Sequence, residues 1–170
     1  MGVEVFHQAQ SICQACGLCC RGVWFSHVEL EAGEVDPARR VGLALKRVDE
    51  TVSFQQPCVL HRNNCCSAYD DWRPRKCVEY SCRLLDRFLA GDVGLDEALT
   101  HVKSVRAMAD RVQEEVGGLG GGLRGDDFLA KLLDSPDAEA AGRPALSPVT
   151  RLDAVALRIY YKKYFKKNAA

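Results

Sequence analysis

The sequence has no excess of either charge and no long apolar run. Its 23 lysine and arginine residues equal its 23 aspartate and glutamate residues, so no overall field attracts nucleic acid or an anionic membrane. No apolar stretch approaches the roughly 20 residues that span a bilayer. The N-terminal segment also lacks the charged start and apolar run of a secretory signal. These absences predict a cytoplasmic protein with no membrane insertion, and they argue against a nucleic-acid partner.

Motifs for the common organic cofactors are absent as well. Residues 117–125 contain six glycines, but no lysine followed by serine or threonine completes a Walker motif, so the segment is typical of a flexible connector. No nucleotide, flavin or nicotinamide motif is visible, and the radical-SAM cysteine triad is missing. The sequence therefore assigns no reaction, and whether the protein is an enzyme stays open.

Cysteine is missing from the second half of the chain, whereas the first half contains all nine. In a reducing cytoplasm such a dense set indicates metal or redox chemistry rather than disulfides, and an odd total fits complete pairing poorly. Thiolates are soft ligands that select zinc, copper(I) or iron–sulfur centres. The cysteines form one block at 13–20 and a second at 58–82, and the doublet Cys65-Cys66 leaves open which of its two thiols is a ligand.

The spacing of the first block suits metal binding. Cys13 and Cys16 can place two sulfurs on one ion across a tight turn, and Gly17 lets the chain pass close to sulfur. Adding Cys19 gives the start of a ferredoxin-type run, but no fourth cysteine follows at the expected distance, so the second block must complete the site. Cys19 and Cys20 should project in different directions, which favours two centres that share this doublet. Eight thiolates at four per centre give two centres, or one centre plus reactive thiols.

Basic residues and one histidine lie close in sequence to the cysteines. The basic side chains could neutralise thiolate charge or donate hydrogen bonds to sulfur, although surface solvation explains them equally well. His61 follows Cys58 at a zinc-ligand spacing, but a lone histidine is more often a surface or packing residue. The basic residues are Arg21, Arg62, Arg73, Arg75, Lys76 and Arg83.

The order of these motifs resembles the YkgJ-like cysteine-cluster family. The pattern spans residues 13–82 and reads Cys13-x-x-Cys16-Gly17-x-Cys19-Cys20, Pro57-Cys58-x-Leu60, Cys66-x-x-Tyr69 and Arg73-Pro74-x-x-Cys77-x-x-Tyr80-x-Cys82. That family is described as zinc- or iron-chelating, and it is sometimes labelled as an iron–sulfur oxidoreductase. The resemblance implies that Cys65 is an additional thiol and that the metal ligands are Cys13, Cys16, Cys19, Cys20, Cys58, Cys66, Cys77 and Cys82.

Local patterns predict a mainly α protein in two parts. Residues 1–92 form an irregular, metal-centred, cysteine-rich region with short helices and little strand, and residues 93–170 form a helical extension. In the first part we expect helices at 27–32, where residues 26–29 form a capping box, and from Asp36-Pro37 to Leu45. We also expect a strand at 51–55 and a turn at Asn63-Asn64.

The remaining pattern is helical. A helix is predicted from Arg75 to a stop at Gly91, and a longer one over 95–116 that ends at Gly117-Gly118. A short helix at 128–133 and a loop at 135–149 precede a final helix capped by Thr150. The apolar face predicted for that helix consists of Leu152, Val155, Ala156, Ile159 and Tyr160, and its end carries Lys162, Lys163, Lys166 and Lys167.

Together these patterns predict a metal-binding cysteine-cluster protein that holds zinc or an iron–sulfur cluster in one or two centres. One alternative is an iron–sulfur redox enzyme or electron carrier, in which Cys19 or Cys65 is a reactive thiol. Another is a zinc-stabilised module that contacts a protein partner through the basic C-terminal helix.

Overall fold

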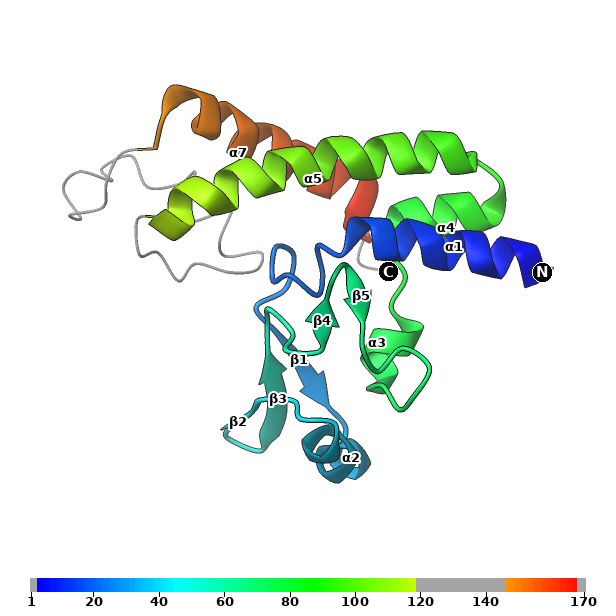
Figure 1. Cartoon of the computed structure of the whole chain (residues 1–170), viewed down its shortest axis with the longest axis vertical. Helices are drawn as coiled ribbons and strands as arrows, with labels where there is room; N and C mark the ends of the chain where they lie inside the picture. The colour runs from blue at the N-terminus through cyan, green and yellow to red at the C-terminus, as the bar shows by residue number, and fades with distance from the viewer. Residues whose placement is uncertain (1–2, 119–145, 168–170) are drawn as a thin grey trace.

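The computed structural model describes residues 3–118 and 146–167. Most of the predicted connector at 117–125, the helix at 128–133 and most of the loop at 135–149 lie outside these ranges. The described chain is mainly helical, as predicted. Figure 1 shows a layer of long helices at the top, with small sheets and short helices below it.

The helical layer consists of α1 (Val3–Cys16), α4 (Arg83–Ala90), α5 (Leu95–Gly118) and α7 (Pro148–Tyr160), which a π-helical turn, η2 (Tyr161–Phe165), extends. Helix α5 contacts α7, α1 and α4, so it is the centre of the layer. The predicted helix over 95–116 is confirmed, and Gly117 and Gly118 still belong to it at the end of the described range. The larger core of the molecule lies between these helices and contains Ile12, Trp24, Leu84, Val105, Val112, Leu157 and Phe165.

Below this layer lies a three-stranded antiparallel sheet. Its strand order is β1 (His27–Leu30), β3 (Thr51–Gln55), β2 (Leu45–Val48), and the short helices η1 (Ala32–Glu34) and α2 (Val35–Arg40) connect β1 to β2. The predicted strand at 51–55 is confirmed. Because α2 ends at Arg40, the predicted helix to Leu45 is too long, and Leu45 begins a strand instead.

The predicted helix at 27–32 is wrong. Val28 lies opposite Phe54 and Leu30 lies opposite Val52 in the antiparallel ladder, so strand pairing overrides the local capping signal. The capping box of this region instead joins Glu31 and Glu34 at the start of η1. A smaller core, which includes Leu30, Ala38, Leu43, Val52 and Phe54, lies between this sheet and α2.

A second, two-stranded sheet is a hairpin of β4 (His61–Arg62) and β5 (Cys65–Cys66). The predicted turn is confirmed, because Asn63 and Asn64 have φ values of 51° and 61°. Two successive residues at positive φ are typical of a tight hairpin turn. Neighbouring residues of a strand point to opposite faces, so the two cysteines of β5 point in opposite directions.

The predicted helix from Arg75 to Gly91 is interrupted. Helix α3 (Arg75–Glu79) ends at Tyr80, whose backbone is extended, and Cys82 then serves as the N-cap of α4. Gly91 ends α4 with a φ of 82°, and its N–H donates to the Phe88 carbonyl, so the predicted stop is confirmed.

The N-cap of α7 lies three residues earlier than the predicted cap at Thr150. This N-cap, Ser147, accepts a hydrogen bond from the backbone N–H of Thr150. Glu115 of α5 accepts hydrogen bonds from the Ser147 N–H and from the hydroxyls of both residues. These bonds attach the start of α7 to α5.

The predicted apolar face of α7 is wrong, because it largely points outward. Leu152 is 71% exposed and Ile159 is 58% exposed, whereas Ala154 and Leu157 are fully buried. Asp153 accepts two hydrogen bonds from Arg111 of α5, at 2.6 and 2.8 Å. This ion pair and the N-cap bonds suit a rotation of α7 in which Ala154 and Leu157 face the larger core while Leu152 and Ile159 face outward.

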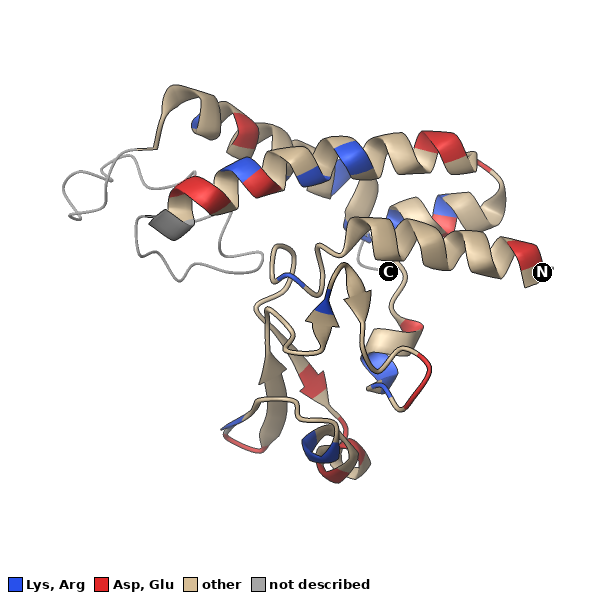
Figure 2. Cartoon of the chain, in the orientation of Figure 1, with Lys and Arg blue, Asp and Glu red and all other residues tan. Residues whose placement is uncertain are grey.

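Acidic and basic residues are mixed over the fold, as Figure 2 shows along α5 and in the lower part of the molecule. No face of one sign is visible in that view, in keeping with the equal numbers of charges. Within the described ranges, no helix combines the length and apolar character needed to cross a bilayer.

We expect Leu157→Ala to lower the free energy of unfolding by about 2–5 kcal/mol, because it leaves a cavity in the larger core. Leu152→Ala, on the same helix, should change it by less than about 0.5 kcal/mol, since that side chain is mostly exposed. Urea unfolding followed by circular dichroism measures both. Equal losses would contradict this orientation of α7.

Candidate metal centre

A cavity of about 580 Å³ lies where the helical layer meets the sheets. Its wall includes Ile12 and Leu84 from the helices and Val28 and Phe54 from the sheet, so much of it is apolar. The cysteines that line it are the eight predicted ligands, Cys13, Cys16, Cys19, Cys20, Cys58, Cys66, Cys77 and Cys82. Cys65 is not among the lining residues. The fold thus brings the two cysteine blocks to one place.

Four of these cysteines lie beside the larger core, and we call Cys13, Cys16, Cys19 and Cys82 the inner group. The last turn of α1 carries Cys13 and Cys16, whose spacing of three places both thiols on one helix face. The helix packs against α4, which begins directly after Cys82, and three of the four thiols contact the larger core. The charges of Cys82 and Cys13 raise the pKa of Cys16, which is the effect expected of close neighbours.

The other four form the outer group, Cys20, Cys58, Cys66 and Cys77. The Cys58 N–H donates to the Cys20 carbonyl at 2.8 Å, and the His61 N–H donates to the Cys58 carbonyl at 3.0 Å. His61 in turn lies opposite Cys66 in the hairpin, so backbone hydrogen bonds and strand pairing connect three of these cysteines. Helix α3 supplies Cys77, whose charge contributes to raising the pKa of Cys20.

The adjacent residues Cys19 and Cys20 thus belong to different groups. Besides burial, the neighbours that raise the pKa of Cys19 are Cys16, Cys82, Cys13 and Cys20, whereas those of Cys20 are Cys58, Cys13, Cys77 and Cys66. All nine cysteines are free thiols. Among the described residues, no three cysteine, histidine, aspartate or glutamate side chains already have the arrangement that holds a metal ion.

Burial controls the protonation of these thiols. Burial is the largest cause that raises the pKa of Cys16 and Cys20 to about 12, and repulsion by neighbouring thiolates adds to it. The pKa of Cys19 is raised well above its ordinary value for the same reasons. At neutral pH these thiols are therefore protonated, and a metal must displace their protons to bind.

His61 is part of the cavity wall. Its Nε2 atom is buried and has no hydrogen-bond partner among the described residues. Burial, followed by the charges of Arg21 and Arg106, lowers the pKa of His61, so the imidazole is neutral at pH 7. A Cβ atom at Gly17, whose φ is +62°, would lie only 3.0 Å from Nε2, so glycine allows the thiol-bearing turn to approach this ring.

The basic residues near the cysteines have different roles. Arg73 lies over the Tyr69 ring at 3.9 Å, and its charge acts to lower the pKa of both Cys13 and Cys77. Arg21 instead reaches α5, where it donates hydrogen bonds to Asp110 and Gln113. Of the basic residues predicted to lie close to thiolates, Arg73 therefore interacts electrostatically with one cysteine of the inner group and one of the outer group.

Arg106 of α5 is a residue that the sequence analysis missed. It donates to the Ala15 carbonyl at 2.7 Å, between two cysteines of the inner group, and to Asn64 Oδ1 at 3.2 Å, in the hairpin turn. Its charge also acts to lower the pKa of Cys16. The sequence carried no signal for this role, because the partners of Arg106 in α1 and in the hairpin turn are distant in sequence.

The donor set fits a soft metal. Eight thiols, a neutral imidazole nitrogen without a partner and a largely apolar wall suit zinc or an iron–sulfur cluster, and they do not suit magnesium or calcium, which take oxygen ligands. The residues that would hold the metal are those of the inner and outer groups.

No protein-family model, curated protein or solved structure matches this chain. The resemblance to the YkgJ-like family therefore remains a prediction from its motifs. The function must be argued from the site itself.

We expect the metal-free protein to lose stability as the pH rises above about 9. The thiols with raised pKa values stay protonated in the folded state up to about pH 12, but they ionise near 9.0 in the unfolded chain. Because only the unfolded chain ionises in this pH range, ionisation shifts the folding equilibrium towards the unfolded state. Anaerobic urea titrations at pH 8, 9 and 10 measure this loss, and constant stability would contradict the burial of these thiols.

Proposed function

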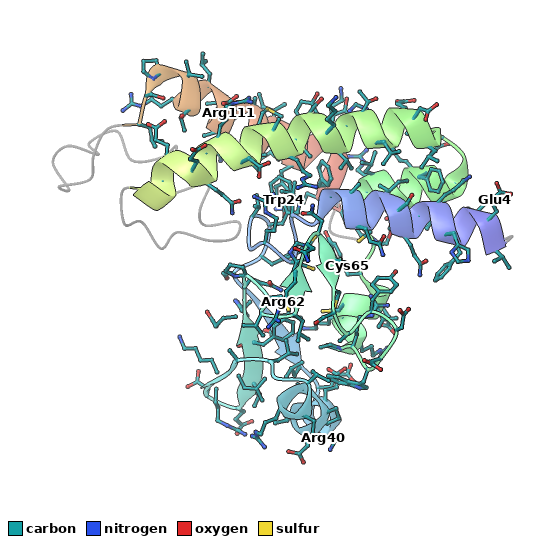
Figure 3. All side chains as sticks on the ribbon, viewed as in Figure 1. Glu4, Trp24, Arg40, Arg62, Cys65 and Arg111 are labelled. Carbon is teal, nitrogen blue, oxygen red and sulfur yellow. The ribbon has the colours of Figure 1, made fainter. Side chains whose placement is uncertain are left out.

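We propose that this protein binds two soft metal centres, zinc ions or iron–sulfur clusters, through its eight cavity cysteines. The observation that carries the proposal is the convergence of two distant cysteine blocks on one cavity while the ninth cysteine, Cys65, lies elsewhere. Figure 3 labels Cys65 on the hairpin below the end of α1, where its sulfur lies 3.9 Å from Gln14 Nε2.

Two centres suit this arrangement better than one. Each group contains four thiols, the number that a tetrahedral zinc site or an iron–sulfur cluster requires. Cys19 and Cys20 lie in different groups, so neither centre needs to hold both members of the doublet. We therefore assign one centre to the inner group and one to the outer group.

Metal binding would require small movements of the thiols. Rotation about χ1 moves a cysteine sulfur among three staggered positions without moving the backbone. When bound, the metal would replace the thiol protons and join segments that are distant in sequence. Such structural zinc contributes on the order of 10–16 kcal/mol of apparent binding energy in small peptides, comparable to the stability of a whole domain.

Neighbouring residues would balance the charge of the thiolates. A zinc ion with four thiolates has a net charge of minus two, which Arg73, near Cys13 and Cys77, and Arg106, near Cys16, would reduce. The buried Nε2 atom of His61 would lie at the cavity wall. In the neutral tautomer that carries its proton on Nε2, this atom can donate a hydrogen bond to a sulfur. These residues hold and orient the thiols.

An iron–sulfur electron carrier is the redox form of this proposal. The cavity wall includes Trp24, Phe54 and Phe165, each about 1% exposed, and limited solvent access influences the potential of such a cluster. Visible absorption of anaerobically purified protein that dithionite bleaches would support this form. A colourless protein with stoichiometric zinc would contradict it.

We expect Cys16→Ser to lower the metal content sharply from about two centres per chain, because it removes one of the four ligands of the inner group. Cys65→Ser should leave the metal content unchanged, since this thiol does not line the cavity. Elemental analysis of anaerobically purified protein measures both. Equal loss in the two variants would show that the eight ligands are assigned wrongly.

A second candidate function is a metal-stabilised module that binds an acidic protein through α7 and η2. The exposed aliphatic face of α7 favours it, because Leu152 and Ile159 have no covering element within the described residues. A large apolar face beside charged groups is typical of an interaction surface. The exposed cations that continue this surface are Lys162, Lys163, Lys166 and Lys167.

This candidate predicts that the full chain binds poly-glutamate and that salt weakens the interaction. A variant with all four lysines changed to glutamine should bind at least tenfold more weakly, because it lacks the cations that attract the polymer. Arg39→Gln, on α2, serves as the surface-charge control. Fluorescence anisotropy with labelled polymer measures binding, and equal affinity of the two variants would contradict this role of α7 and η2.

A further inference from the structure

Helix α3, which carries Cys77, is the least anchored element of the outer group. It is five residues long and none of its side chains is buried. Val78, its aliphatic residue, is 58% exposed, so the helix contributes no side chain to either core. Hydrophobic packing therefore does little to keep Cys77 at the cavity.

Charged contacts at the surface attach α3 to β1 and η1. Lys76 Nζ lies 2.6 Å from Glu29 Oε2 on β1, and Arg75 Nη1 lies 3.1 Å from Glu31 Oε1. The Arg75 N–H also donates to Glu34 Oε1 at 2.6 Å. In Figure 2 the basic start of α3 lies beside the acidic residue of β1. All four side chains in the ion pairs are more than half exposed, so salt screens these pairs strongly.

The cysteines of the inner group have firmer supports. Cys13 and Cys16 lie in the last turn of α1, next to Ile12, whose side chain is 2% exposed. Cys82 is the N-cap of α4, and Leu84 in the first turn of that helix is fully buried. These cysteines cannot leave their positions unless part of the larger core opens. Within the outer group, the backbone hydrogen bonds and the strand pairing that connect Cys20, Cys58 and Cys66 do not include Cys77.

We propose that α3 is a detachable arm and that Cys77 is a releasable ligand, so the outer group exchanges its metal while the inner group retains its own. The inference rests on the proposed function and adds a route by which a bound ion leaves or enters. If the outer group held a zinc ion, its bond to the Cys77 sulfur would break first and a bond to a donor atom of an incoming chelator would form. The freed Cys77 thiolate would take up a proton from water, and no electron would be transferred.

The experiment uses the full chain loaded with two equivalents of zinc under anaerobic conditions and mixed with excess chromogenic zinc chelator. One equivalent should leave at least tenfold faster than the other. Weakening the arm with the double variant Glu29→Gln and Lys76→Gln should speed the fast phase at least threefold and leave the slow phase unchanged. Raising the salt concentration should have the same effect on the wild-type protein.

The matched control is Asp36→Asn, which removes an exposed ion pair with Arg39 on α2, away from the cysteines. It should release zinc at the wild-type rates. A further variant, Cys77→Ser, should lose the fast equivalent and keep the slow one.

Three results would overturn the inference. Release of both equivalents in one phase, a fast phase that the double variant does not change, or loss of both ions in Cys77→Ser would each do so. A chain that binds no zinc or iron at all would overturn the proposed function, and the inference with it. Normal two-ion loading with a single release phase would overturn the detachable arm alone.

Discussion

The position of both cysteine blocks depends on their attachment to α5. This helix packs against α1, α4 and α7, and its side chains reach two of the segments that carry thiols. Arg106 binds the backbone between the first two cysteines and also the hairpin turn, while Asp110 and Gln113 hold Arg21 directly after the Cys19-Cys20 doublet. The helical half of the chain, which contains no cysteine, thus orients the cysteine-rich half.

The larger and the smaller core support the two cysteine groups differently. The larger core makes the inner group rigid, because opening it would expose many apolar side chains. The smaller core supports the sheet but not α3, so the outer group depends more on backbone hydrogen bonds and on surface ion pairs. Each group consists of four cysteine thiols. The two groups therefore differ in burial and not in ligand type.

Local patterns predicted much of the fold. The periodicity of α5, the stop at Gly91, the strand at 51–55 and the Asn63-Asn64 turn are encoded by neighbouring residues. Pairing with β3 turned the expected helix at 27–32 into a strand, and the Arg111–Asp153 ion pair suits an orientation of α7 other than the expected one. Helix α1 was not predicted, since only Ala9 and Ile12 are buried in it and they form too weak a periodic pattern. The eight cysteines could be singled out from spacing, but Arg106 could not, because its partners are distant in sequence.

Trp24, labelled in Figure 3, lies in the larger core and stacks on Tyr161 at 4.7 Å, with Phe165 at 5.4 Å. The ribosome makes the first cysteine block and this indole long before it makes the two rings that cover the indole. For much of that interval α5, which supports the thiol-bearing segments, does not exist either. The larger core can therefore close only after Phe165 has been synthesised.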